Sequence, residues 1–155
     1  MNNLSELLNY TYGLCEDGDY DNALEYFDAI LTKDPQNSNI LIDKGVTLEY
    51  LDRLPESLGC YNAALKLDPQ SIDALINKGA VLHKMTRYHE SILCYDQALK
   101  LDKKSVIAMT YKGLALGESG ELNEALQYFD KAISIDSTYD LAINSRKTAI
   151  NLMNE

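Results

Sequence analysis

The chain repeats itself at a fixed interval of 34 residues. The stretches IDKGVTLEYLDRLPESLGCYNAALKLD and INKGAVLHKMTRYHESILCYDQALKLD begin one interval apart, at Ile42 and Ile76. Three columns keep this step, namely glycines that each follow a lysine, aromatic residues and aspartates: Gly45, Gly79, Gly113; Phe27, Tyr61, Tyr95, Phe129; and Asp34, Asp68, Asp102, Asp136. Agreement over so many columns is typical of a chain built from stacked, equivalent modules.

Each module is expected to contain two antiparallel helices. Apolar residues recur every three or four positions, as at Leu58, Tyr61 and Leu65, which is the spacing of one helix face. Pro55 lies where the second helix of its module would begin, a position that suits proline. We expect helices near residues 3–16 and 20–33, 38–51 and 54–67, 72–85 and 88–101, and 106–119 and 122–135.

The residues between the helices match the chemistry of helix ends. Gly18 and Gly120 follow first helices, and glycine readily takes the left-handed conformation that ends a helix. Asn37, Ser71 and Ser105 precede first helices, where their side chains can accept hydrogen bonds from unpaired backbone N–H groups.

Small residues predict where helices approach closely. A larger side chain at a column glycine would push the helix pair apart. A second small-residue column is expected at the same contact: Ala23, Ser57, Ser91 and Ala125. The aromatic column is expected to fill the volume between neighbouring modules. We therefore assign these columns structural rather than catalytic roles.

The pattern of Lys-Gly in the first helix and A…(Y/F)xxAL(K)LDP in the second resembles the tetratricopeptide repeat (TPR). The resemblance covers four repeats, at about residues 4–37, 38–71, 72–105 and 106–139. It implies an all-α fold, a right-handed superhelical α-solenoid whose first helices line a concave groove. Thr11 replaces a column glycine, so we expect looser packing in the first repeat; Lys103 and Ser137 replace the closing proline.

The residues after the fourth repeat predict a terminal helix at 140–153. Five residues of this segment follow a helical apolar pattern beside polar neighbours: Leu141, Ile143, Ala149, Ile150 and Met153. Stacked repeats need a terminal helix with a polar outer face, so residues 140–155 are expected to cap the array. The whole chain, 1–155, is expected to form a single TPR domain.

The charge balance restricts the partners. A net charge of −10, from 14 basic and 24 acidic residues, argues against nucleic acid and anionic membranes. Residues 1–37 carry eight acidic side chains and one basic one, whereas residues 72–105 carry four and six. An uneven distribution of charge along the chain can orient a charged partner as it binds. The alternative is an acidic end that is merely solvated.

The sequence predicts a cytoplasmic protein. Its apolar runs are shorter than the roughly 20 residues that span a bilayer, and MNNLSELLNY lacks the features of a secretory signal. Cys60 and Cys94 lie one repeat apart, on the order of 10 Å in stacked repeats and too far for a disulfide. With Cys15 they are expected to be reduced thiols.

No motif for catalysis or cofactor binding is present. The two histidines, His83 and His89, are six residues apart, and there is no nucleophile elbow, HExxH, Walker or dinucleotide-binding motif. We expect neither an enzyme nor a cofactor. The cysteines and histidines also lack the spacing of zinc ligands.

One stretch resembles a calcium loop in its spacing. Its first, third, fifth and twelfth positions are aspartates: Asp17, Asp19, Asp21 and Asp28. Asn22 replaces the glycine that the sixth position requires, and the stretch coincides with a turn and a predicted helix. A structural reading is therefore preferred to a metal site.

The predicted binding surface is the concave groove. Its candidate residues flank the packing columns, chiefly on first helices: Leu8, Tyr12, Ile42, Asp43, Val46, Glu49, Tyr50, Asp73, Asn77, His83, Tyr111 and Leu114. Tyrosines and aliphatic residues among a few charges are typical of a protein-binding surface. We expect a peptide or helical segment of another protein, apolar and basic in character, to bind there.

The resemblance also suggests the carboxylate clamp, with which some family members grip the C-terminal tails of heat-shock chaperones. The clamp positions here hold Leu8, Tyr12, Asp43, Asp73 and Asn77, and the two aspartates would repel an anionic tail. A chaperone tail is therefore disfavoured. The alternative to a monomeric groove adaptor is a self-associating scaffold module that uses its convex face or its ends.

Overall fold

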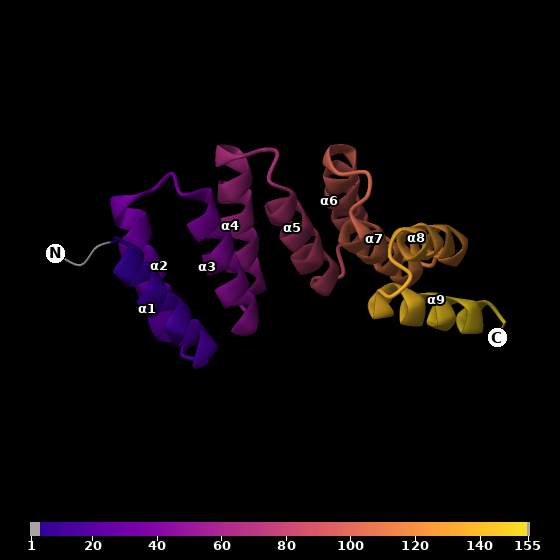
Figure 1. Cartoon of the computed structure of the whole chain (residues 1–155), viewed down its shortest axis with the longest axis horizontal. Coiled ribbons are helices and arrows are strands. Elements are labelled where there is room, and N and C mark those ends of the chain that lie inside the picture. Colours follow the sequence, from indigo (N-terminus) through magenta and orange to yellow (C-terminus); the bar gives the residue numbers. More distant parts are fainter. Residues whose placement is uncertain (1–3, 155) are drawn as a thin grey trace. The chain divides into compact units, whose positions relative to one another are not determined.

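The computed structural model describes residues 4–154, in which all regular secondary structure is helical (Figure 1). The nine helices of this range are α1 Leu4–Glu16, α2 Tyr20–Lys33, α3 Ser38–Tyr50, α4 Leu54–Leu67, α5 Ile72–Lys84, α6 Tyr88–Leu101, α7 Val106–Glu118, α8 Leu122–Ile135 and α9 Asp140–Met153. The predicted helix pairs are confirmed. Three first helices end one residue earlier than predicted, and residues 3 and 155 of the predicted boundaries lie outside the described residues.

The chain divides into two compact units, Met1–Asn77 and Lys78–Glu155, which we call the N-terminal and C-terminal units. The division falls within α5. In the N-terminal unit α2 packs on α1 and α3, and α3 packs on α4. In the C-terminal unit α7 packs on α6 and α8, and α8 packs on α9.

The column glycines allow an aromatic ring to lie directly on the backbone of the first helix. A Cβ atom at Gly45 would lie 2.6 Å from Cε1 of Tyr61, and one at Gly113 would lie 2.6 Å from Cε1 of Phe129. Real Cβ atoms do not approach other atoms so closely. Gly79 stands in the same relation to Tyr95. The predicted close approach is thus confirmed.

The aromatic column packs within its own repeat, and this differs from the sequence-based expectation. Tyr61 and Tyr95 cover the glycine of the preceding helix in the same repeat. Tyr95 also stacks on Tyr111 of the next repeat, with ring centroids 6.1 Å apart. The sequence predicted only a contact between repeats, because a 34-residue period does not show whether an aromatic ring packs against its own repeat or against the neighbouring one.

The second small-residue column and the predicted caps are also in place. Ser91 is fully buried and donates a hydrogen bond to the carbonyl of Gly79, 2.8 Å away, across the helix pair. Asn37, Ser71 and Ser105 each accept from a backbone N–H three residues later, at 3.2 Å.

The turn after each first helix passes through the left-handed region. Gly18 and Gly120 have φ of 78° and 96°, as predicted. Asp52 and Thr86 occupy the equivalent positions with φ of 56° and 59°. The turn geometry therefore persists where the sequence has no glycine, although a β-branched residue such as Thr86 is strained in this conformation.

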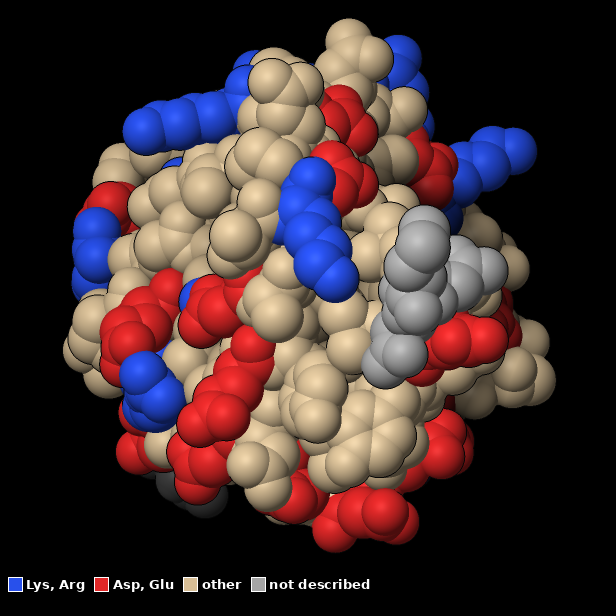
Figure 2. Space-filling view, turned by 90° about the vertical axis from the view of Figure 1, so that its left-hand side faces the viewer, with Lys and Arg blue, Asp and Glu red and all other residues tan. Residues whose placement is uncertain are grey.

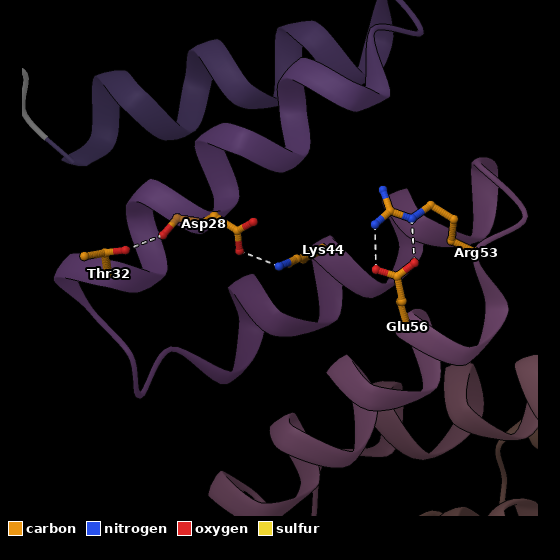
Figure 3. A network of polar contacts seen from close by, with 5 residues as sticks. All are labelled: Asp28, Thr32, Lys44, Arg53 and Glu56. Carbon is orange, nitrogen blue, oxygen red and sulfur yellow. Dashed lines mark hydrogen bonds and ion pairs between the residues drawn. The ribbon is translucent and has the colours of Figure 1, made fainter.

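Successive repeats are joined by ion pairs 16 residues apart. Lys44 of α3 pairs with Asp28 of α2, as Figure 3 shows. In the C-terminal unit Lys112 lies 2.6 Å from Asp96, and Arg146 of α9 lies 2.5 Å from Asp130.

A second recurring ion pair lies within one turn at the start of the second helix. Arg53 forms two hydrogen bonds with Glu56, at 2.7 and 2.5 Å (Figure 3). Arg87 and Glu90 repeat the arrangement one interval later. Because these pairs are exposed, water and salt screen them, and they add little to the stability of the fold.

Lys112 is the most buried of the inter-repeat cations. Burial by itself lowers the pKa of its ammonium group, but hydrogen bonds to Asp96 and Tyr128 outweigh burial and raise the pKa above its ordinary value. Its Nζ atom also lies 4.2 Å from the ring centroid of Tyr128. The lysine of the Lys-Gly pair is thus part of the joint between repeats.

The terminal helix is confirmed as α9, but its outer face is less polar than expected. Ala142 and Ala149 are buried against the fourth repeat. Leu141, Leu152 and Met153 are 37%, 52% and 44% exposed. Of the residues predicted for the apolar face, Ala149 is buried, whereas Leu141 and Met153 are exposed, and Ala142, which the predicted pattern does not include, is buried.

The packing of α7 against α8 is tested by the same substitution, glycine to alanine, at each of two positions of α7. Gly113→Ala is expected to lower the free energy of unfolding by about 1–3 kcal/mol, because the new methyl group overlaps the Phe129 ring. Gly117→Ala adds a methyl group at ordinary contact distance from Ala125 and is expected to stabilise by up to about 1 kcal/mol through helix propensity. Urea unfolding measures both, and equal effects would contradict the assigned contact.

The inter-repeat ion pairs predict unequal effects of removing one aspartate charge. Asp96→Asn is expected to cost about 1–3 kcal/mol, because it leaves the buried Lys112 ammonium without its charged partner. Asp28→Asn is the matched control, and its more exposed pair with Lys44 predicts a loss below about 1 kcal/mol. Thermal or urea unfolding distinguishes them; a larger loss for Asp28→Asn would contradict the burial argument.

Candidate functional site

The N-terminal unit contains a pocket between α1, α2 and α3. Its volume is about 270 Å³. Four predicted groove residues line it together: Tyr12, Asp43, Val46 and Tyr50. The other lining residues are Cys15, Glu16, Tyr20, Phe27 and Thr47. The structure thus brings together residues of two first helices, and adds two residues of the helix between them.

A hydrogen bond between α1 and α3 forms one wall. The Tyr12 hydroxyl donates to Oδ2 of Asp43 over 2.6 Å. Burial, followed by this hydrogen bond and the negative charge of Asp43, raises the pKa of Tyr12 well above its ordinary value. The phenol therefore stays protonated and holds the carboxylate in a fixed orientation.

Two stacked rings also line the pocket. Tyr20 and Tyr50 are nearly parallel, with a 4° angle between planes and 4.9 Å between centroids. Tyr50 is 68% exposed, so one of its faces remains accessible to a partner. Phe27 lies at the pocket floor and meets Tyr12 edge to face, at 6.2 Å.

The remaining predicted residues of the N-terminal unit lie apart from this pocket's lining. Leu8 packs against the core around Phe27 and Ile30, and Ile42 is 8% exposed. Glu49 accepts a 2.6 Å hydrogen bond from the Tyr61 hydroxyl. The pKa of the Tyr61 phenol is raised, first by burial and second by this hydrogen bond. Asp73 is exposed and Asn77 half-buried on α5.

In the C-terminal unit the predicted residues lie at two places. His83 Nε2 is 2.9 Å from Glu118, and its ring meets Tyr88 edge to face at 5.4 Å. Tyr111 stacks on Tyr95, while Leu114 packs against the core around Phe129. Burial and a hydrogen bond to Glu118 raise the pKa of Tyr88.

Sequence reasoning missed Tyr20 and Tyr88, which lie at equivalent positions at the start of second helices. The predicted groove residues all lie on first helices. The signal that could have found them is the 34-residue step itself, because both tyrosines follow the turn and face the end of the first helices.

The calcium-like stretch does not form a loop. Asp21 and Asp28 lie on α2, and Asp19 accepts a hydrogen bond from Asn22 at 2.7 Å. Within residues 4–154 no group of three or more His, Cys, Asp and Glu side chains could hold a metal ion. The cysteines of this range are free thiols. No helix in the same range has the length and apolarity to cross a bilayer.

The repeated helix pairs define the chain as a helical-repeat protein. Models of the tetratricopeptide repeat match residues 14–74 and 76–140. The chain belongs to the tetratricopeptide repeat family, as predicted. Comparison with curated proteins gives no match.

Solved structures share the fold. A crystal structure of the MamA protein matches with a TM-score of 0.84 and 22% identity, over 96% of this chain and 81% of that one. A tetratricopeptide repeat protein from Parabacteroides merdae gives 0.84 and 22%, over 94% and 58%. The first TPR of Spaghetti (RPAP3), bound to the HSP90 peptide SRMEEVD, gives 0.74 and 17%, over 77% and 95%. These similarities support the predicted α-solenoid fold.

A double-mutant cycle tests the wall formed by Tyr12 and Asp43. Tyr12→Phe and Asp43→Ala are each expected to lower the free energy of unfolding by about 0.5–1.5 kcal/mol. Since they remove the same bond, the double variant is expected to lose less than the sum. Tyr10→Phe on the same helix is the control, with an expected change below about 0.5 kcal/mol. Strict additivity would contradict the contact.

The same contact predicts a pH dependence. The folded state holds the Tyr12 proton more tightly than the unfolded state does, so stability falls as the pH rises above about 10, the ordinary pKa of tyrosine. Tyr12→Phe removes this contribution, and its stability is expected to fall less steeply above that pH.

Proposed function

We propose that the protein is a non-enzymatic adaptor that binds a peptide or helical segment of another protein in the groove lined by its first helices. Membership of the tetratricopeptide repeat family supports a role in protein–protein interaction. The observation that carries the groove proposal is the pocket between α1 and α3, in which Tyr12 and Tyr50 are exposed although neither belongs to a packing column.

Exposed aromatic residues are the usual anchors of such binding. Tyr12 and Tyr50 are 40% and 68% exposed, and neither belongs to the glycine–aromatic contact that holds a repeat together. Aromatic side chains at the centre of an interface contribute most of its binding energy, commonly about 2 kcal/mol or more each. Val46 adds an aliphatic surface between them.

The charge of the groove supports a partner that is apolar and basic rather than acidic. One similar domain is bound to the acidic HSP90 peptide SRMEEVD. Here Asp43 and Asp73 stand at the positions that correspond to that mode of binding, and like charges across an interface cost several kcal/mol. The proposed partner segment is therefore not a chaperone tail.

A self-associating scaffold is the second candidate. The exposed Leu141, Leu152 and Met153 of α9 favour it, because a terminal helix normally presents a polar outer face. Light scattering over a concentration series distinguishes the two functions. A groove adaptor remains monomeric over the range, whereas an end-to-end assembly grows with concentration and is reversed by Leu152→Lys.

The groove proposal predicts how a captured partner responds to substitution. Tyr50→Ala is expected to weaken binding at every salt concentration, because it removes an aromatic anchor. Asp43→Lys is expected to weaken it most at low salt, because salt screens the repulsion between the new lysine and a basic partner. Partners captured from native lysate are identified by mass spectrometry, and their affinities are then measured with purified protein.

Leu93→Ala is the matched control for this experiment. Leu93 is 50% exposed but lies on α6, a second helix, outside the proposed groove. All three variants are expected to keep wild-type helicity. A partner that binds Tyr50→Ala and Asp43→Lys as tightly as wild type, and is lost with Leu93→Ala, would place the working surface elsewhere.

A further inference from the structure

The pocket of the N-terminal unit combines aromatic faces with carboxylates. Tyr12, Tyr20, Tyr50 and Phe27 supply four rings, and Glu16 and Asp43 supply two acidic groups. Lysine and arginine are absent from its lining. Its volume of about 270 Å³ is below the roughly 300–1,000 Å³ typical of small-molecule sites, so it suits a single side chain.

Rings and carboxylates together favour a cation. The face of an aromatic ring is electronegative and attracts a cation within about 6 Å of its centroid. The parallel stack of Tyr20 on Tyr50 leaves the outer face of the exposed Tyr50 ring available. Asp43 is held beside these rings by the hydrogen bond from Tyr12, so the negative charge is already oriented before a ligand arrives.

The surrounding charge has the same sign. Residues 1–37, which contain α1 and α2, carry eight acidic side chains and one basic one. Figure 2 views the side of the molecule that bears the N-terminal helices, and acidic side chains gather over the lower part of this face. A cation is therefore attracted toward this unit before it reaches the pocket.

The equivalent positions two repeats later do not reproduce this composition. Lys84 stands at the place of Glu16, and Tyr111 at the place of Asp43. Tyr12 is replaced there by Ala80. The acidic, aromatic composition is thus particular to the pocket between the first two repeats and does not follow from the repeat pattern.

We infer that this pocket binds the side chain of an arginine in the partner segment. A guanidinium group is planar, stacks on aromatic faces and donates paired hydrogen bonds to a carboxylate, which matches the Tyr50 face and the Asp43 carboxylate. The inference rests on the proposed groove function and specifies the residue that the groove selects. An acidic side chain would meet two carboxylates, and a purely apolar one would desolvate them without supplying an opposite charge.

The test uses the full chain and a probe that needs no partner protein. N-acetyl-arginine-N-methylamide is titrated into isotope-labelled protein and followed by two-dimensional NMR. Saturable shifts are expected at the Val46 methyl groups and at the amides around Tyr12 and Tyr50. The citrulline analogue has nearly the same shape without the charge, and it is expected to bind at least about tenfold more weakly, since charged hydrogen bonds contribute about 1.5–3 kcal/mol.

Conservative variants separate the charge and ring contributions. Asp43→Asn keeps the shape and is expected to weaken arginine binding by at least about tenfold. Tyr50→Leu keeps an apolar side chain but removes the ring, with an expected loss of about two- to fivefold, whereas Tyr50→Phe is expected to bind like wild type. Glu124→Gln, on α8 of the C-terminal unit, is the control for general charge and is expected to change nothing.

The outcomes distinguish this inference from the proposed function. Absence of saturable shifts, equal binding of the citrulline analogue, or no effect of Asp43→Asn would overturn the arginine site. If Tyr50→Ala still abolished capture of a partner in that case, the groove function would stand with an apolar anchor in this pocket. If arginine bound as expected but partner binding ignored every groove variant, the groove function would fail instead.

Discussion

The structure depends on the contact between a glycine backbone and an aromatic ring inside each of the second, third and fourth repeats. The rings of Tyr61, Tyr95 and Phe129 occupy the space that a Cβ atom would fill on the facing helix. This contact fixes the separation of the two helices, and it also fixes their rotation, because only one face of the first helix carries the glycine.

The remaining columns extend this pair into an array. Buried small residues such as Ser91 close the pair. Two of the lysines that precede a column glycine also reach an aspartate of the previous repeat: Lys44 pairs with Asp28, and Lys112 pairs with Asp96. Each repeat thus contacts chiefly its neighbours, so stability accumulates from local contacts. Residues outside these columns can vary without loss of the fold, and apart from Phe27 the candidate site is composed of such residues.

Much of the candidate site could be predicted because the spacing of residues in a helix shows which side chains lie on the same face of that helix. Tyr12, Asp43, Val46 and Tyr50 were assigned to one surface from their spacing alone, and all four line one pocket. Spacing could not identify Tyr20, because it begins a second helix and reaches the pocket only through the turn geometry. Nor could it show that Ile42 is buried, since the residues covering it come from elsewhere in the sequence.

The sequence by itself determined the helix pairs, their ends and the family. Helix propensity and helix capping depend on neighbouring residues, and the 34-residue period can be read directly from the sequence because the same pattern recurs in each repeat. Tertiary structure alone decided which partners the side chains meet. The hydrogen bond from Tyr12 to Asp43 and the stack of Tyr20 on Tyr50 join residues about 30 positions apart. Such contacts depend on how the helices are rotated about their axes and on how far apart they lie, and these are properties of the packed helices that no local sequence pattern specifies.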